Sequence, residues 1–236
     1  VDEAHFGRAL DPTIASQLFA TVRRPRLGFY GVIDERLDVD LVTRLADAEP
    51  DWQICLVGPV VKIDPATLPL RANVHYLPQQ RYEDLPTMLA AWDVCLLPFA
   101  LNDSTRFISP TKTLEYMCAR KPVVSTEIRD VGRLYADGVA LAADPGAFVE
   151  ACRNALAESA ATRSARIEAQ AALVSATSWD RAAEHVLREV EATLGQGLSA
   201  SALDYLSHRR VIDLPVKNPP RVDRHVEWLI LGAGAT

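Results

Sequence analysis

The sequence predicts a doubly wound, Rossmann-like α/β domain on a parallel sheet of about six strands. Short segments that are apolar throughout alternate with segments in which apolar residues recur at helical spacing. Strands that are apolar on both faces are typical of parallel sheets covered by helices on both sides. Ligands bind such sheets beyond the carboxyl ends of the strands, so we expect binding residues in the loops that follow the strands.

The apolar segments are short and bounded by turn residues or charges. They predict strands at 26–32, 52–58, 73–77, 93–98, 122–126 and 139–143. Helical spacing predicts helices over 11–21, 41–48, 85–92 and 111–120, and then Ala-rich helices over 145–159, 161–175 and 178–194. The predicted helix 41–48 stops before Pro50, and Pro59 ends the predicted strand 52–58. Residues 101–110 are expected to form a polar loop.

Composition excludes several classes of function. The 25 Lys and Arg residues against 31 Asp and Glu give a formal charge of −6, and no basic run is present, which argues against nucleic acid or an anionic membrane as partner. No apolar stretch approaches the ~20 residues that span a bilayer, and no signal peptide opens the chain. The five His residues lack metal-ligand spacing, so no metal is expected, and the four Cys residues are expected to be buried free thiols in a reducing compartment.

The polar loop and the helix after it carry the most informative pattern. Ser109 is a good N-cap, and Pro110 suits the first helical position. A helix N-terminus beyond a parallel strand favours an anion such as pyrophosphate. Arg106 and Lys112 would balance phosphate charge, and Glu115 could accept hydrogen bonds from ribose hydroxyls. Spacing alone leaves open a surface helix with a Lys112–Glu115 pair worth a few tenths of a kcal/mol.

Several segments together carry a family resemblance. They are Val1-Asp-Glu-Ala-His-Phe6, Leu56-Val-Gly-Pro59, Asn73-Val-His-Tyr-Leu77, Trp92-Asp-Val-Cys-Leu-Leu-Pro98, Ser109-Pro-Thr-Lys-Thr-Leu-Glu-Tyr-Met117 with Lys121-Pro-Val-Val124, and Ser178-Trp-Asp180. In this order and spacing, residues 1–194 resemble the C-terminal half of GT-B-fold glycosyltransferases of the family-4 type. That half binds the nucleotide sugar.

The resemblance assigns a role to individual residues. It implies that Glu115 holds the donor ribose and that the backbone of Ser109, Pro110 and Thr111 cradles the diphosphate. Gly31 would be the glycine that faces the phosphates, although it could simply end a strand. The turn from 78 to Tyr82 would contact the base, although Tyr82 could simply pack against Leu85.

Three positions depart from the family pattern. Phe107 stands where the first of two paired glutamates is expected, and Arg120 replaces the usual glycine before Lys121. The loop from Gly31 to Arg36 leaves Arg36 as its lone cation. These departures bear on the sugar contacts and the retaining outcome more than on the nucleotide site.

The far end carries a second resemblance. Residues 226–236 read as a strand that enters a GxGxxG turn, where glycines let a backbone meet a pyrophosphate. They resemble the first strand of a flavoprotein of the amine-oxidase or UDP-galactopyranose mutase type. The third glycine and its helix are absent from this sequence, so FAD is expected only in a downstream domain.

The expected organisation is therefore in five parts. Residues 1–24 are a crossover segment with an N-terminal helix, 25–160 the nucleotide-sugar-binding domain, 161–194 the C-terminal helices, 195–225 a linker, and 226–236 the start of a second dinucleotide-binding domain. The chain then reads as a cut from a longer polypeptide.

The function expected from the resemblance is glycosyl transfer. A UDP- or GDP-type nucleotide-diphosphate sugar would be the donor, no cofactor would be required, and a hexosyl group would pass to a carbohydrate or lipid-linked acceptor. The expected partners are the missing N-terminal half and a fused flavoprotein domain, and this half alone would be inactive. The expected location is cytoplasmic, or peripheral to the inner face of the membrane. Two alternatives remain, a GT-B-fold sugar-nucleotide epimerase and a non-enzymatic scaffold that docks a flavoenzyme.

Overall fold

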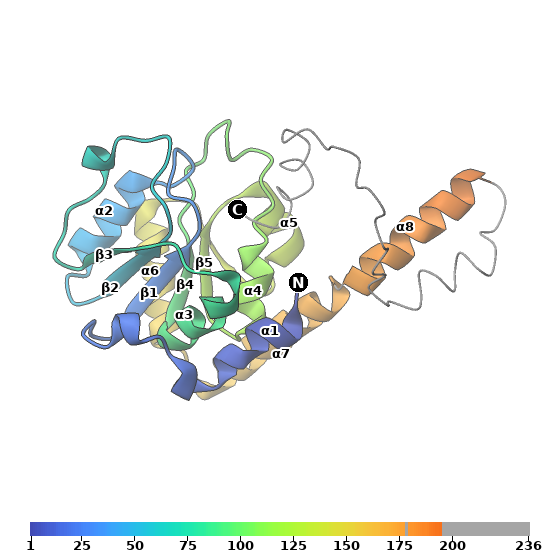
Figure 1. Ribbon diagram of the computed structural model, residues 1–236, viewed down its shortest axis with the longest axis horizontal. Coiled ribbons are helices and arrows are strands. Elements are labelled where there is room, and N and C mark those ends of the chain that lie inside the picture. The colour runs from blue at the N-terminus through green and yellow to red at the C-terminus, as the bar shows by residue number, and fades with distance from the viewer. Residues whose placement is uncertain (178, 195–236) are drawn as a thin grey trace, which may run out of the picture. The chain divides into compact units, whose positions relative to one another are not determined.

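The computed structural model describes residues 1–177 and 179–194, and its first unit is built around a six-stranded parallel sheet (Figure 1). The strand order is β3-β2-β1-β4-β5-β6. The strands are β1 (Arg26–Tyr30), β2 (Gln53–Val57), β3 (Val74–Leu77), β4 (Val94–Leu97), β5 (Val123–Thr126) and β6 (Ala140–Ala142). The predicted fold class is confirmed, and each predicted strand is found one or two residues shorter.

Helices cover this sheet in two groups. In one group, α2 (Val39–Ala48) packs on α6 (Pro145–Leu156), which lies against β4, β5 and β6. In the other, α4 (Lys112–Cys118) contacts β5 and also α1 (Glu3–Gly7) and α7 (Ala160–Ala176), while α1 contacts α3 (Leu85–Ala91). A short helix, α5 (Arg129–Tyr135), links β5 to β6. Helices on both faces explain why the strands carry apolar residues throughout.

Side-chain caps fix where several helices begin. The carboxylate of Asp38 accepts from the Leu41 N–H at 2.8 Å at the start of α2, and Asp144 accepts from Ala147 at 2.9 Å at the start of α6. These caps satisfy backbone donors that have no partner inside the helix. The start of α6 agrees with the prediction, whereas α2 begins two residues before the predicted position 41.

The segment 11–21 does not form the single helix predicted for it. It forms two 3₁₀ turns, Pro12–Ile14 and Gln17–Phe19. The side chain of Asp11 accepts from the Thr13 N–H at 2.9 Å, and Ser16 Oγ accepts from the Leu18 N–H at 3.3 Å. These local side-chain bonds compete with helix continuation, so the apolar spacing was misleading here.

The strand order reverses between β1 and β4, which are neighbours in the sheet although β2 and β3 lie between them in the chain. A crevice at the carboxyl ends of two such strands is the usual ligand site of a doubly wound sheet. The residues after β1 and those that face them from α4 are therefore the first place to look for function.

Four further findings concern the described residues. Cys55, Cys95, Cys118 and Cys152 are buried free thiols, as predicted. Within 1–177 and 179–194, no helix has both the length and the apolarity needed to cross a membrane. No group of three or more His, Cys, Asp or Glu side chains in those ranges could hold a metal ion. A separate unit begins after residue 178 and includes α8 (Trp179–Leu194). Together with α6 and α7, this helix confirms the three C-terminal helices that the sequence predicts.

The predicted linker at 195–225 and the glycine turn at 226–236 lie outside the described residues. The same is true of Ser178, at the start of one segment that carries the family resemblance.

Replacing Gly28 in β1 with alanine is expected to destabilise the fold by more than about 3 kcal/mol. A Cβ atom at Gly28 would lie 1.9 Å from Cδ2 of Trp92, a ring that is 1% exposed and cannot move aside without disturbing its neighbours. The matched control is Gly132→Ala in α5, where the new Cβ would meet its nearest atom at 3.5 Å. Urea unfolding should show Gly132→Ala within about 1 kcal/mol of the native chain or more stable. Equal stability of the two variants would contradict this packing.

Candidate functional site

Gly31 directly follows β1 at the point where the strand order reverses, and its backbone lies against a lysine of α4. Its φ angle is +142°, a conformation that side-chain-bearing residues rarely adopt. A Cβ atom at this position would lie 3.2 Å from both Cε and Nζ of Lys112. The absence of a side chain therefore leaves the Lys112 amine next to bare backbone.

The Lys112 amine is buried and forms no ion pair with any of the described residues. The side chain is 9% exposed, and its Nζ lies 5.3 Å from the ring centre of Phe29 and 5.4 Å from that of Phe99. Among the described residues, no carboxylate lies within ion-pair distance of this amine. Burial lowers the pKa of Lys112 to about 8, although the charge of Glu115 opposes the shift. An ammonium held between aromatic rings is well placed to meet an anion.

Glu115 lies one turn further along α4 and is held in place by β1. Tyr30 Oη donates a 2.5 Å hydrogen bond to Oε2 of Glu115. Burial raises the pKa of the Glu115 carboxyl, while the Tyr30 hydrogen bond and the Lys112 charge work against that rise. The Tyr30 backbone N–H in turn donates to Tyr116 Oη at 3.3 Å. The carboxylate thus has a fixed orientation near Lys112.

The turn after β2 closes against the turn after β1. Gly58 has a φ of +149°, and a Cβ on it would lie 1.9 Å from the carbonyl oxygen of Gly31. The Gly31 N–H donates to the Val57 carbonyl at 2.9 Å. Only glycine fits at Gly58, and this close contact fixes the backbone of Gly31 beside Lys112.

Arg36, predicted as the lone cation of the first loop, is already paired. Its guanidinium donates to both carboxylate oxygens of Asp34, from Nε to Oδ1 and to Oδ2 at 3.0 Å each and from Nη2 to Oδ2 at 2.7 Å. Burial by itself would raise the pKa of Asp34, but the hydrogen bonds from Arg36 outweigh it and lower that pKa. The charge of Arg36 is balanced in this pair, so Lys112 is the cation that adjoins Gly31.

The predicted start of α4 is wrong. Ser109 is not the N-cap and Pro110 is not the first helical residue: α4 begins at Lys112 after Thr111, and no side chain caps it. The chain instead makes a tight turn in which the Thr113 N–H donates to the Pro110 carbonyl at 3.1 Å, which delays the helix. The alternative of an exposed Lys112–Glu115 pair is also wrong, because Lys112 is buried without an ion pair. Arg106 is exposed in this loop, with its guanidinium 5.2 Å from the ring centre of Phe107.

Tyr82 packs against the N-terminal segment rather than standing alone. The ring of His5 stacks on it with centroids 4.3 Å apart, and Phe6 meets it edge-on at 5.6 Å. The Tyr82 ring remains 45% exposed. The stacking on His5 fixes the orientation of an exposed aromatic surface after β3.

The family model of the glycosyl transferases group 1 matches residues 24–158, which contain every strand of the sheet and all of α4. The chain belongs to this family. The putative teichuronic acid biosynthesis glycosyltransferase TuaH of Bacillus subtilis (strain 168), a curated relative of this group 1 chain, is 25% identical over 142 residues. That alignment covers 56% of this chain and 35% of TuaH.

Solved structures share the fold of this group 1 domain. Anabaena Alr3699/HepE in complex with UDP-glucose has a TM-score of 0.60 at 17% identity, over 78% of this chain and 53% of that one. A UDP-forming α,α-trehalose-phosphate synthase from Burkholderia vietnamiensis has a TM-score of 0.60 at 15% identity, over 81% and 52%. The likeness shows a GT-B-like fold, and the chain spans about half of each solved relative.

The fold of this group 1 chain brings together Gly31, Lys112 and Glu115 from the predicted set. Sequence reasoning missed Tyr30, Phe29 and Phe99, which orient or enclose Glu115 and Lys112. Tyr30 directly precedes Gly31, so its place at a strand end was a signal for it. Phe29 and Phe99 had no such signal in the sequence. They enclose Lys112 only because the ends of two strands that are distant in the chain meet in the folded sheet.

Lys112→Met is expected to remove a pH dependence of stability. The pKa of the amine is about 8 in the folded protein, against an ordinary value of 10.5. Between these pH values the unfolded chain holds the proton and the folded chain has released it, so stability rises with pH across that window. Below it both states are protonated, and the buried charge costs about 3 kcal/mol.

Urea unfolding of both proteins from about pH 7 to about pH 10 tests this, because the difference between the two curves isolates Lys112. The native chain should gain stability relative to Lys112→Met as the pH rises. Parallel curves would show that the amine is not desolvated.

Proposed function

We propose that this chain is the donor-binding half of a GT-B glycosyltransferase and holds a nucleotide-diphosphate sugar in the crevice after β1. The observation that carries the proposal is the Lys112 amine, which is buried, has no carboxylate within ion-pair distance among residues 1–177 and 179–194, and adjoins the bare backbone of Gly31. A protein rarely keeps such a charge unless a ligand neutralises it. A diphosphate supplies the required negative charge.

Lys112 would act on the leaving group. When a sugar leaves a nucleoside diphosphate, negative charge grows on the departing oxygen. A cation fixed beside that oxygen in a low-dielectric site stabilises the charge as it develops. The rings of Phe29 and Phe99 exclude water from the amine and strengthen this interaction.

Glu115 would bind the ribose. Tyr30 donates to Oε2, and none of the interactions of the described residues engages Oε1. An ionised carboxylate accepts from hydroxyl groups, and a fixed orientation lowers the entropy lost on binding. Ser109, Pro110 and Thr111 would line the path of the diphosphate, with Arg106 on the exposed loop. The exposed ring of Tyr82 would contact the base.

The relatives support a UDP-type donor. Alr3699/HepE has been crystallised with UDP-glucose, and the trehalose-phosphate synthase is described as UDP-forming. The group 1 family supports glycosyl transfer. A carbohydrate or lipid-linked acceptor is part of the proposal. The hexosyl type of the donor, a UDP rather than a GDP base, and the position of this half at the C-terminal side of the enzyme belong to the same proposal.

Transfer would need a second half. In a two-domain glycosyltransferase the reacting groups meet in a cleft between the halves, and this chain spans about half of its solved relatives. We therefore expect the chain alone to bind a nucleotide without transferring sugar.

Isothermal titration calorimetry of the chain with UDP, GDP, UDP-glucose and uridine tests the site. UDP should bind more tightly than uridine, and Lys112→Met should weaken UDP by about tenfold or more while leaving uridine unchanged. The control is Arg44→Met, which removes an exposed cation paired with Asp40 on α2. Loss of UDP binding in the control, or no binding of any nucleotide, would contradict the proposal.

Tyr30→Phe is expected to weaken UDP severalfold by releasing Glu115, because the ring is kept and only the hydroxyl is lost. The affinity for 2′,3′-dideoxy-UDP, which offers no ribose hydroxyls to Glu115, should not change. Tyr135→Phe removes a hydroxyl from another buried tyrosine, on α5, and serves as the control. An equal loss for both ligands would place the effect on the fold rather than on the ribose contact.

A further inference from the structure

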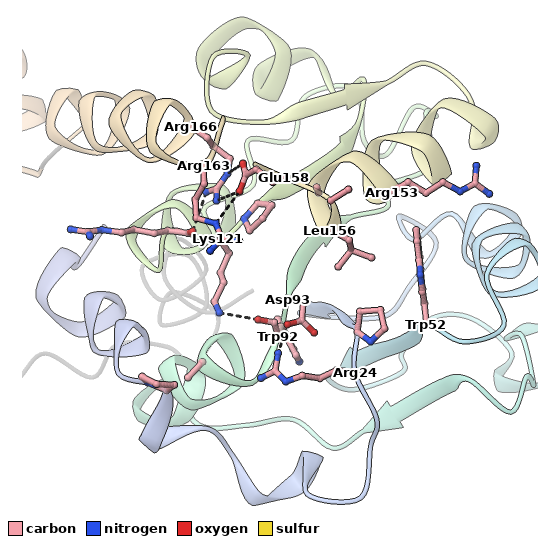
Figure 2. A pocket seen from close by; sticks show the side chains of 17 residues that line it. Arg24, Trp52, Trp92, Asp93, Lys121, Arg153, Leu156, Glu158, Arg163 and Arg166 are labelled. Carbon is pink, nitrogen blue, oxygen red and sulfur yellow. Dashed lines mark hydrogen bonds and ion pairs between the residues drawn. The ribbon is translucent and has the colours of Figure 1, made fainter. Parts of the chain in front are cut away.

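A second cleft opens at the opposite edge of the sheet, where the strands begin. It has a volume of about 810 Å³ and lies among the residues that directly precede β1, β2, β4 and β5 and those of the α6–α7 connection (Figure 2). The strands are parallel, so their amino ends all lie at this edge and the Gly31 site lies at the other. A cleft of this size suits a small organic ligand. None of the proposed donor-site residues Gly31, Lys112 and Glu115 lines this cleft.

The cleft is basic although the chain is acidic. Its lining includes six cationic side chains, Arg24, Arg120, Lys121, Arg153, Arg163 and Arg166, against the two carboxylates of Asp93 and Glu158. The formal charge of the whole chain is −6. The concentration of cations in one hollow is therefore not a consequence of overall composition.

Some of these cations are already paired. Arg24 pairs with Asp93, and Arg153 pairs with Glu49 and Glu150. Arg166 binds Glu158 through two contacts, of 2.7 and 2.9 Å. These pairs form the walls of the cleft and leave little charge for a ligand.

Three cations remain in surplus. Lys121 donates to the backbone carbonyl of Trp92 at 2.8 Å and forms no ion pair within the described residues, and Figure 2 shows its side chain extending across the cleft toward Asp93. Burial lowers the pKa of its amine. Arg163 forms a longer ion pair with Glu158, Nε to Oε2 at 3.5 Å, so Arg163 and Arg166 share this carboxylate and one of their two charges is not balanced. Arg120 is exposed and forms no ion pair with any of the described residues.

The backbone of Arg120 gives an independent reason to look for a ligand. Its φ is +52°, at the left-handed position that ends α4. The Arg120 N–H donates to Met117 and the Lys121 N–H to Tyr116, at 2.8 and 3.1 Å, which is the pattern of a Schellman cap. Glycine fills this position most often because a side chain there costs free energy. The helix end accounts for the backbone conformation but not for an arginine in it, and a strained residue at a cleft is a pointer to function.

Apolar groups complete the cleft. Trp52, Pro25, Pro122 and Leu156 line it beside the cations. Surplus cations next to apolar walls suit a ligand with a doubly charged phosphate on a carbon body. We propose that this cleft binds the phosphomonoester group of a small molecule or of a lipid headgroup, independently of the donor site.

Calorimetry with glucose 6-phosphate and glucose, and co-sedimentation with phosphatidylcholine vesicles with and without phosphatidic acid, test this proposal and separate the two sources. Binding of glucose 6-phosphate alone identifies a soluble ligand, and binding only to vesicles with phosphatidic acid identifies a headgroup. Either result supports the proposal if Arg120→Gly and Arg163→Gln each weaken it about tenfold. Glucose should not bind.

Two features keep the test decisive. Glycine suits the left-handed position, so Arg120→Gly keeps its fold, and Arg163 is an exposed side chain, so Arg163→Gln does not disturb the core. Arg44→Gln is the matched control on α2. Both cleft variants should bind UDP normally, and Lys112→Met should bind the phosphomonoester normally. No binding of either phosphorylated probe, or binding that Lys112→Met abolishes and the cleft variants keep, would overturn the proposal.

Discussion

Strand β1 lies at the centre of the sheet, and the rest of the structure depends on how closely other groups approach its backbone. At Gly28 the ring of Trp92 occupies the space that a Cβ would need. Directly after the strand, a Cβ on Gly31 would lie 3.2 Å from Cε and Nζ of Lys112, and a Cβ on Gly58 would lie 1.9 Å from the Gly31 carbonyl oxygen. The contact at Gly28 allows Trp92, at the end of α3, to pack directly on the strand. The contact at Gly31 places Lys112 next to the backbone of the candidate site. One strand therefore sets both the packing of the core and the geometry of the crevice.

Burial of two ionisable groups at the candidate site lowers the stability of the protein without ligand. Desolvation disfavours the charged forms of both Lys112 and Glu115, and their mutual attraction offsets this only in part. Tyr30 orients the carboxylate without neutralising it. Such groups lower the stability of the empty protein, and an anion that meets Lys112 recovers part of that free energy on binding. Arg36 shows the contrast, because its pairing with Asp34 stabilises the loop and leaves no charge for a ligand.

A parallel sheet has two chemically different edges, and this domain uses them differently. At the carboxyl edge, glycine turns expose backbone beside one buried amine. At the amino edge, residues that precede the strands form a cleft with surplus cations. The five residues of β1 separate the two edges by on the order of 15 Å. At that distance the two sites can bind different ligands, and a charge at one is largely screened from the other.

The sequence by itself determined the fold class and the number of strands with their places along the chain, and it predicted Gly31, Lys112 and Glu115 as candidate site residues. Those features rest on local patterns, since apolar runs, helical spacing and turn residues act over a few neighbouring positions. It misjudged 11–21 and the start of α4, where side-chain bonds and a tight turn overrode the apolar spacing and the expected cap. Only the tertiary structure decided that Lys112 is buried between Phe29 and Phe99, that Tyr30 holds Glu115, and that Arg36 is taken up by Asp34. How deeply a side chain is buried and which group it pairs with depend mostly on which strand ends and helices are neighbours in the folded domain. Local patterns along the chain do not contain that information.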